Sequence, residues 1–302
     1  MLSYKVFLSL IIATIAASFA SILVRLSSAD ALIIVFYRLT FATILMTIGA
    51  EITNNHAQLK KIPAIPKQDQ WQIVLSGFFL AIHFATWTMA VQNTSVASAV
   101  VLGGSAQIFV LLLSIFLLGE RSSRQQILGI LISVLGGIII ALGDMEVEGA
   151  ESLVGDVLAI IGAVSIAIYL VIGRNCRQNY DLFTYVTPVY GICAIFLFIY
   201  ALLAQQALIG LNWEEYVLFF LLALGPSCLG HTLFNYALKE ASAPLVAVVL
   251  LGEPIGASLL AIVILNEFPH LFTVVGGIGV LLGITICVVY EQARVATNNL
   301  SK

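Results

Sequence analysis

Ten apolar runs, each about 20 residues long, constrain this 302-residue chain more than any other feature of its sequence. A helix needs about 20 apolar residues to cross the ~30 Å hydrocarbon core of a bilayer, whereas a barrel strand needs only about ten. The runs also lack the polar–apolar alternation of barrel strands. We therefore predict an all-α polytopic membrane protein with ten transmembrane helices. These helices are expected at 6–25, 31–50, 71–91, 96–118, 125–143, 154–172, 182–204, 215–237, 243–265 and 271–290.

The composition excludes the main classes of water-soluble protein. Hydrophobic residues make up 61% of the chain and charged residues only 10%, whereas soluble domains carry about 25% charged residues. The net charge of −3 excludes a basic nucleic-acid-binding protein. Three of the four cysteines fall inside apolar runs, so we interpret them as small core residues and not as disulfides or metal ligands.

Lys and Arg residues are distributed unequally between the two sides of the predicted bundle. Arg25 alone falls on one side, Arg38 lies inside 31–50, and eleven basic residues fall on the side of the two termini. Basic loops stay in the cytoplasm, so we predict that both termini are cytoplasmic. The short loops favour the plasma (inner) membrane of a prokaryote. The eleven residues are Lys5, Lys60, Lys61, Lys67, Arg121, Arg124, Arg174, Arg177, Lys239, Arg294 and Lys302.

The chain matches itself without gaps at an offset of 147 residues. From position 90 to 139, thirteen of fifty residues are identical to their counterparts, including Glu120 with Glu267 and Gly136 with Gly283. We therefore divide the chain into repeats 1–147 and 148–302, each with five predicted helices. Because five is odd, the second repeat must be inverted in the membrane, which is typical of secondary transporters. Some channels and membrane enzymes also contain duplications.

Several motifs are similar to those of a known family. They are Gly155-Asp156 with Ala163, Ser165, Tyr169 and Arg174, then Gly230-His231-Thr232, Asn235-Tyr236-Ala237-Leu238, Glu253-Pro254, Leu265-Asn266-Glu267, and Gly276-Gly277 with Gly283. The chain thus resembles two EamA domains of the drug/metabolite transporter superfamily. The resemblance implies a ten-helix bundle around a central cavity that exports or imports small metabolites. The first repeat departs from the pattern, because Ala106-Gln107 stands where the second has Glu253-Pro254.

Polar side chains at bilayer depth are the candidates for a functional site, because a charge at the centre of a membrane helix costs roughly 3 kcal/mol. Glu253 is expected near the membrane midplane, where Pro254 should kink its helix. We interpret Glu253 either as a protonatable or ammonium-binding carboxyl or as a cap for backbone groups freed by the kink. Ser227, His231 and Asn235 are four residues apart and should share one helix face, which predicts a cavity wall or a hydrogen-bonded seam.

The repeat register relates some of the remaining candidates to one another. His83 aligns with Gly230, so it is expected near His231 close to the pseudo-two-fold axis, and Trp87 aligns with Phe234. Trp87 is interpreted either as a pocket wall or as a core or lipid-facing ring.

Arg38 aligns with Tyr185, on a run that also contains a kink candidate, Pro188. Arg38 either extends to the membrane interface or binds a carboxylate or phosphate in the cavity. Gln107, after Gly103-Gly104-Ser105, is a further candidate at the midplane. Small residues one turn apart in 125–143 and 271–290 should allow those two helices to pack closely. They are Gly129, Ser133, Gly137, Gly276, Gly279 and Gly283.

Together these patterns predict a secondary transporter that works by alternating access. The expected substrates are small polar or amphipathic metabolites, with amino acids or related compounds favoured, and export is favoured over import. A channel-like facilitator and an integral-membrane enzyme are the alternatives. No phosphate-binding loop or metal-ligand cluster occurs in the sequence, so no cofactor and no catalytic residue are expected. The expected partners are the lipid bilayer, the substrate and protons, which His231 and Glu253 could carry.

Overall fold

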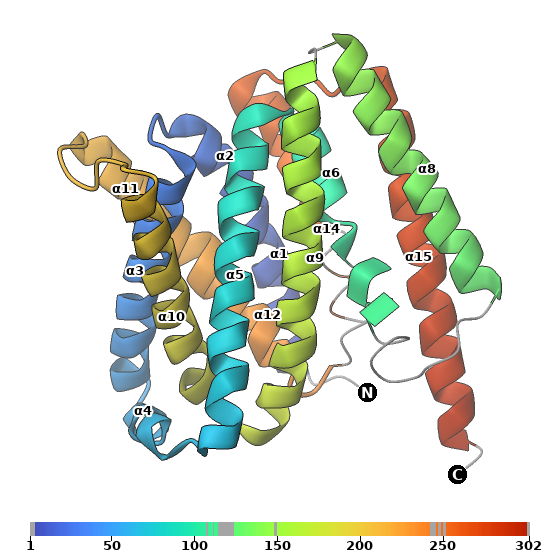
Figure 1. Cartoon of the computed structure of the whole chain (residues 1–302). Helices are drawn as coiled ribbons and strands as arrows, with labels where there is room; N and C mark the ends of the chain where they lie inside the picture. The colour runs from blue at the N-terminus through green and yellow to red at the C-terminus, as the bar shows by residue number, and fades with distance from the viewer. Residues whose placement is uncertain are drawn as a thin grey trace.

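The computed structural model describes residues 4–106, 108–110, 112–113, 124–147, 150–241, 246, 249 and 252–300, and within these residues every regular element is a helix (Figure 1). The first repeat contains α1 (Tyr4–Ser18), α2 (Ala20–Leu26), α3 (Ala31–Ile52), α4 (His56–Lys60), η1 (Ile62–Ala64), α5 (Lys67–Asn93), α6 (Val96–Gly103) and α8 (Arg124–Val147). The second contains α9 (Ala150–Asn179), α10 (Leu182–Leu203), α11 (Trp213–Leu222), η2 (Ala223–His231), α12 (Thr232–Ala237), α14 (Gly252–Leu260), η3 (Ala261–Leu265) and α15 (Leu271–Leu300).

Six helical segments of the described chain are long and apolar enough to cross a membrane. They are Tyr4–Leu26, Ala31–Ile52, Lys67–Asn93, Ser152–Asn179, Leu182–Leu203 and Trp213–Ala237. Shorter apolar helices, Val96–Val110, Ile127–Ile140, Ile255–Leu265 and Leu271–Gly283, overlap the other four predicted runs. Large apolar side chains also cover the outside, such as Leu135 and Ile138 on α8 and Ile278 on α15. The predicted all-helical, multi-pass membrane class is therefore confirmed, while the count of ten crossings stays a prediction.

The predicted helix 215–237 is not uniform. It consists of α11, the π-helical segment η2 and α12. Pro226 lies inside η2 and has no N–H to donate, and π-helical turns accommodate such gaps in the hydrogen-bond ladder. The carbonyl of Ser227 accepts hydrogen bonds from Thr232 Oγ1 at 3.1 Å and from Tyr190 Oη at 3.2 Å. The same carbonyl also accepts the backbone N–H of Thr232, so two side chains add to the five-residue hydrogen bond that is typical of a π-helical turn.

The two prolines predicted to kink their helices lie in different settings. Pro188 lies inside α10, which continues as one α-helix from Leu182 to Leu203. Pro254 lies in the first turn of α14, which begins at Gly252. The two residues before this helix, 250–251, are outside the described residues. Both kinks remain predictions.

Helices at equivalent positions of the two repeats pack against each other. α3 contacts α10, α6 contacts α14, and α8 lies along α15 (Figure 1). In the α8–α15 pair a Cβ atom added to Gly136 would lie 2.5 Å from the carbonyl oxygen of Gly276, and one added to Gly283 would lie 2.3 Å from that of Gly129. Ser133 Oγ donates a 3.0 Å hydrogen bond to the carbonyl of Val280. These small residues allow the close packing that the sequence predicts.

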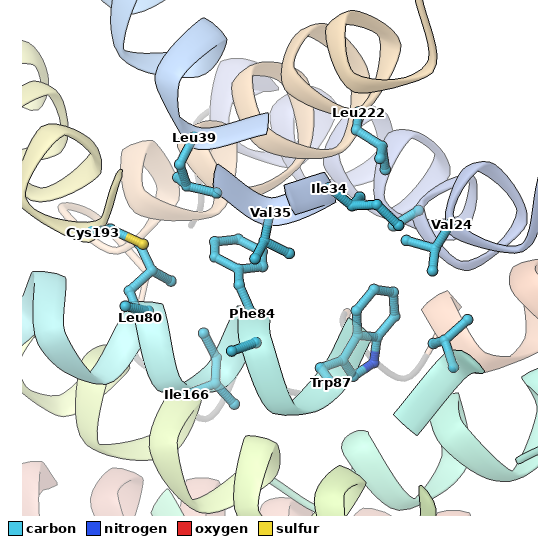
Figure 2. Close-up of a cluster of buried hydrophobic side chains, with 14 of the residues drawn as sticks. Val24, Ile34, Val35, Leu39, Leu80, Phe84, Trp87, Ile166, Cys193 and Leu222 are labelled. Atoms are coloured by element: carbon cyan, nitrogen blue, oxygen red, sulfur yellow. The ribbon is translucent and has the colours of Figure 1, made fainter. Parts of the chain in front are cut away.

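A continuous apolar core joins the two halves (Figure 2). Leu39 of α3, Leu80 and Phe84 of α5, Ile166 of α9 and Cys193 of α10 all belong to it. Cys193 is fully buried and free, which agrees with its interpretation as a small core residue.

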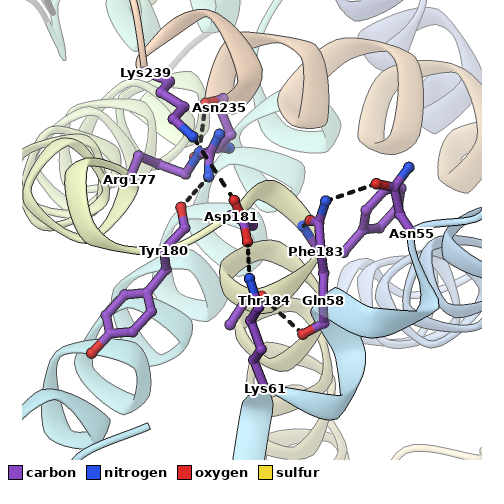
Figure 3. Close-up of polar contacts among 10 residues, drawn as sticks. All are labelled: Asn55, Gln58, Lys61, Arg177, Tyr180, Asp181, Phe183, Thr184, Asn235 and Lys239. Atoms are coloured by element: carbon purple, nitrogen blue, oxygen red, sulfur yellow. Dashed lines mark hydrogen bonds and ion pairs between the residues drawn. The ribbon is translucent and has the colours of Figure 1, made fainter.

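Charged side chains gather at opposite ends of the bundle. At the α4 end, Lys61 donates a 2.7 Å hydrogen bond to Asp181, and Lys239 Nζ lies 3.8 Å from the same carboxyl (Figure 3). The bond from Lys61 holds the pKa of Asp181 below its usual range. At the α2 end, Arg25 pairs with Glu267 at 3.2 Å. Three of the basic residues predicted for the two sides, Arg25, Lys61 and Lys239, thus lie beside carboxylates.

Candidate functional site

A cavity of about 90 Å³ lies in the middle of the bundle, between the two repeats. One water molecule needs roughly 10–15 Å³ on this scale, so several fit. The lining is mainly apolar, with a few polar groups. Six of the predicted site residues line it: Arg38, His83, Trp87, His231, Asn235 and Glu253. They come from α3, α5, η2, α12 and α14, so both repeats contribute.

The guanidinium of Arg38 is held in position from two sides. Its side chain is 1% exposed, its Nε donates a 2.8 Å hydrogen bond to Ser227 Oγ, and its Cζ lies 4.2 Å from the centroid of the Phe84 ring. Within the described chain, Nη1 and Nη2 have no hydrogen-bond partner. Arg38 therefore does not extend to the interface, and this cavity-lining side chain has two terminal nitrogens without a partner among the described residues.

The two cavity histidines lie close together. The ring centroids of His83 and His231 are 6.1 Å apart, and His231 meets Phe84 edge to face at 5.0 Å. His83 Nδ1 lies 3.0 Å from the carbonyl oxygen of Gly162 and must donate to it, because a carbonyl only accepts. This bond fixes the His83 ring and leaves Nε2 as its other polar atom.

Asn235, which lines the cavity, has one acceptor that no described residue satisfies. Its Nδ2 donates to the carbonyl of His231 at 2.8 Å and to Tyr169 Oη at 2.7 Å. The bond to a carbonyl fixes the orientation of the amide, since only the NH₂ group can donate. Asn235 Oδ1 is buried and has no hydrogen-bond partner in the described part of the chain.

Aromatic rings form much of the remaining wall. Trp87 and Phe234, which occupy equivalent repeat positions, both line the cavity. Trp87 is 6% exposed and packs against Gly103, where an added Cβ would come within 3.2 Å of its ring. Trp87 thus belongs to the pocket wall and does not face lipid.

Three predicted candidates are placed differently. Ser227 is fully buried behind the wall, where it binds Arg38. Tyr185 is also fully buried, and its hydroxyl lies 2.6 Å from Ser76 Oγ. Gln107 lies outside the described residues.

Phe84 and Tyr169 are two of the cavity residues that were not among the candidates. Phe84 is apolar, but the repeat register aligns it with His231, which could have identified it. Tyr169 occurs in a motif of the second repeat without having been assigned a role. Among the described residues no group of three or more His, Cys, Asp or Glu could hold a metal ion. The arrangement is suited to reversible binding of a small solute with charged groups.

Comparisons with known proteins agree with this architecture. The model of the EamA-like transporter family matches residues 4–142 and 153–289. An uncharacterized transporter of Archaeoglobus fulgidus is 28% identical over 275 residues, covering 89% of this chain and 91% of the relative. One of Clostridium kluyveri is 25% identical over 240 residues, covering 78% and 76%. A solved crystal structure aligns with a TM-score of 0.67 at 18% identity, covering 95% of this chain and 98% of the other, which shows a shared fold.

Proposed function

Because the chain belongs to the EamA-like transporter family and is therefore a membrane transporter, we propose that it is a secondary transporter working by alternating access. Its substrates are small polar or amphipathic metabolites, amino acids or related compounds above all, and the direction is export. The observation that carries this proposal is the central cavity, which presents polar groups from both repeats inside an apolar core.

The contacts between α8 and α15 support ten crossings in two inverted repeats, 1–147 and 148–302. Gly136 lies against Gly276, the counterpart of Gly129, while Gly129 lies against Gly283, the counterpart of Gly136. A two-fold axis produces such reciprocal contacts. The repeats can then exchange their packing around a fixed site, as alternating access requires.

The proposal includes cytoplasmic termini, a plasma (inner) membrane location and protons as the coupling ion. The unequal distribution of Lys and Arg supports the orientation. His231 and Glu253, which both line the cavity, are the proposed proton carriers. A substrate and a proton would then compete for the same small space, which is a simple way to couple their movements.

Counterflow in proteoliposomes tests the proposal. Vesicles containing the protein are loaded with one unlabelled amino acid and diluted into a trace of the same radiolabelled compound, over a panel of amino acids. A carrier accumulates label transiently above its equilibrium level, whereas a channel only equilibrates it, and empty vesicles give the background. An imposed pH gradient should drive accumulation, and Glu253→Gln should remove its effect. Transport that changes neither with pH nor on addition of a protonophore would refute proton coupling but not the carrier mechanism.

A further inference from the structure

We propose that the cavity binds zwitterionic amino acids with apolar side chains, with the carboxylate on Nη1 and Nη2 of Arg38 and the ammonium between Glu253 and Asn235 Oδ1. The proposal rests on the proposed function, because it names the substrate class and the binding mode of the same cavity. Two unpartnered, buried polar groups that line one cavity carry it.

Arg38 has the geometry of a carboxylate receptor. A buried guanidinium without a hydrogen-bonded anionic partner is strongly unfavourable, and among the described residues no carboxylate binds the two terminal nitrogens of this cavity-lining arginine. Ser227 occupies Nε, so a ligand can use only the end formed by Nη1 and Nη2. Two parallel N–H groups match the two oxygens of a carboxylate.

The charge balance of the cavity favours a zwitterion over a phosphate. Glu253 lines the cavity and interacts electrostatically with Arg38 without satisfying its terminal nitrogens. One cation and one carboxyl therefore face the same space. A zwitterion complements both, whereas a phosphate dianion would be repelled by Glu253 and balanced by a single guanidinium.

The ammonium has two acceptors. Bonds from Nδ2 to His231 and Tyr169 fix the Asn235 amide, and its Oδ1 has no partner among the described residues. An ammonium has three donors and no acceptor, so it can bind this oxygen and the carboxyl of Glu253 together. A ligand with a hydrogen atom in place of the ammonium would leave both Asn235 Oδ1 and the Glu253 carboxyl without a donor.

The rest of the cavity suits an apolar side chain. Trp87 and Phe234 line it from equivalent positions of the two repeats, and Ile166 and Leu170 add aliphatic surface. The polar groups thus hold the head of an amino acid, while the aromatic and aliphatic wall receives its side chain.

Trp87 provides a reporter inside the cavity that is independent of transport. The chain has three tryptophans, and the other two, Trp71 and Trp213, are 57% and 70% exposed. The full-length protein with Trp71→Phe and Trp213→Phe, in nanodiscs, therefore reports binding through Trp87 fluorescence alone. The probes are L-valine, isovalerate, which lacks the amino group, and isobutylamine, which lacks the carboxylate.

We expect L-valine to change the fluorescence saturably, and each analogue to bind at least about tenfold more weakly, because each leaves one charged group unpaired. Arg38→Lys, which keeps the charge but loses the fork, should weaken L-valine at least about tenfold and remove its advantage over isobutylamine. Glu253→Gln should remove its advantage over isovalerate. Tyr185→Phe, at the repeat position equivalent to Arg38, is the matched control and should bind L-valine normally.

Equal binding of the three probes to the unmodified cavity would overturn the proposal without relying on any variant. So would counterflow of a metabolite without a carboxylate that Arg38→Gln leaves unchanged, although the carrier mechanism would then stand. L-Valine binding that depends on Arg38 and Glu253, in vesicles that show no counterflow of any amino acid, would instead support this site and refute the carrier.

Discussion

Arg38 and Tyr185 occupy the same position in the two repeats, and each binds a serine of the opposite repeat. Tyr185 Oη lies 2.6 Å from Ser76 Oγ, which satisfies its polar atom. Arg38 Nε donates to Ser227 Oγ at 2.8 Å, and its two further nitrogens bind no group in the part of the chain that the structure describes. The two contacts are alike, but only the larger polar group has donors left for a ligand. The contacts that the two repeats share thus belong to the scaffold, whereas the residue that differs between them, Arg38, belongs to the site.

The helices that contain Ser76 and Ser227 also occupy equivalent positions in the two repeats, and they differ in regularity. α5 is α-helical from Lys67 to Asn93, whereas its counterpart is interrupted by η2 around Pro226. The interruption lies beside Ser227 and ends at His231, so it adjusts the backbone where the second repeat supplies polar groups to the site. π-Helical turns occur frequently at functional sites.

The largest effect should follow from making the two positions alike. Arg38→Tyr removes the anion receptor, and we expect counterflow to fall to the background of empty vesicles. Because the substitution also removes a buried, unpaired charge, the melting temperature without substrate should stay the same or rise. Tyr185→Phe should do the opposite, costing about 1 kcal/mol of stability while transport stays within about twofold. Lost transport in both variants, with equal destabilisation, would show that the two positions have the same structural role.

A smaller effect should follow from removing the serines. Ser227→Ala leaves Nε of Arg38 unpaired and the guanidinium free to turn, so the Kd of L-valine should rise by about three- to tenfold, without loss of binding. Ser76→Ala is the matched control, because it frees only Tyr185, and the Kd should not change. Trp87 fluorescence measures both. A Kd that rises equally in the two variants would mean that Ser227 does not orient Arg38.

The sequence was sufficient to predict the helical membrane class and most of the polar groups around the cavity, because a charge or a histidine in an apolar run is itself a signal. It was not sufficient for Ser227. The prediction placed Ser227 on one face with His231 and Asn235 by assuming regular α-helix, whereas η2 changes the register between them. Ser227 therefore points behind the wall, where it supports Arg38.

Phe84 could not be predicted from its own character, because an apolar residue in an apolar run gives no signal. Its importance comes from contacts between distant segments, with Arg38 at 4.2 Å and with His231 at 5.0 Å. Such contacts depend on how α3, α5 and η2 pack together. The repeat register, which aligns Phe84 with His231, is the only part of the sequence that indicates this contact.

The smallest effect concerns charges that, unlike those of Arg38, are already paired. Lys61 and Lys239 both lie beside Asp181, whose pKa is held down first by the hydrogen bond from Lys61. A carboxyl with a depressed pKa stabilises the fold above its unfolded value of about 3.9 and loses that contribution as the pH falls through its folded pKa. The group is 34% exposed and screened, so the contribution should be at most about 1 kcal/mol. We expect Asp181→Asn in nanodiscs to lower the melting temperature slightly at pH 7, and the difference from wild type should shrink as the pH falls below about 3.9 toward the lowered folded pKa. Counterflow at pH 7 should stay within about twofold, because this network lies at the α4 end and outside the cavity. A difference in melting temperature that does not shrink at all as the pH falls below about 3.9 would mean that Asp181 stabilises the bundle by packing and not by its charge.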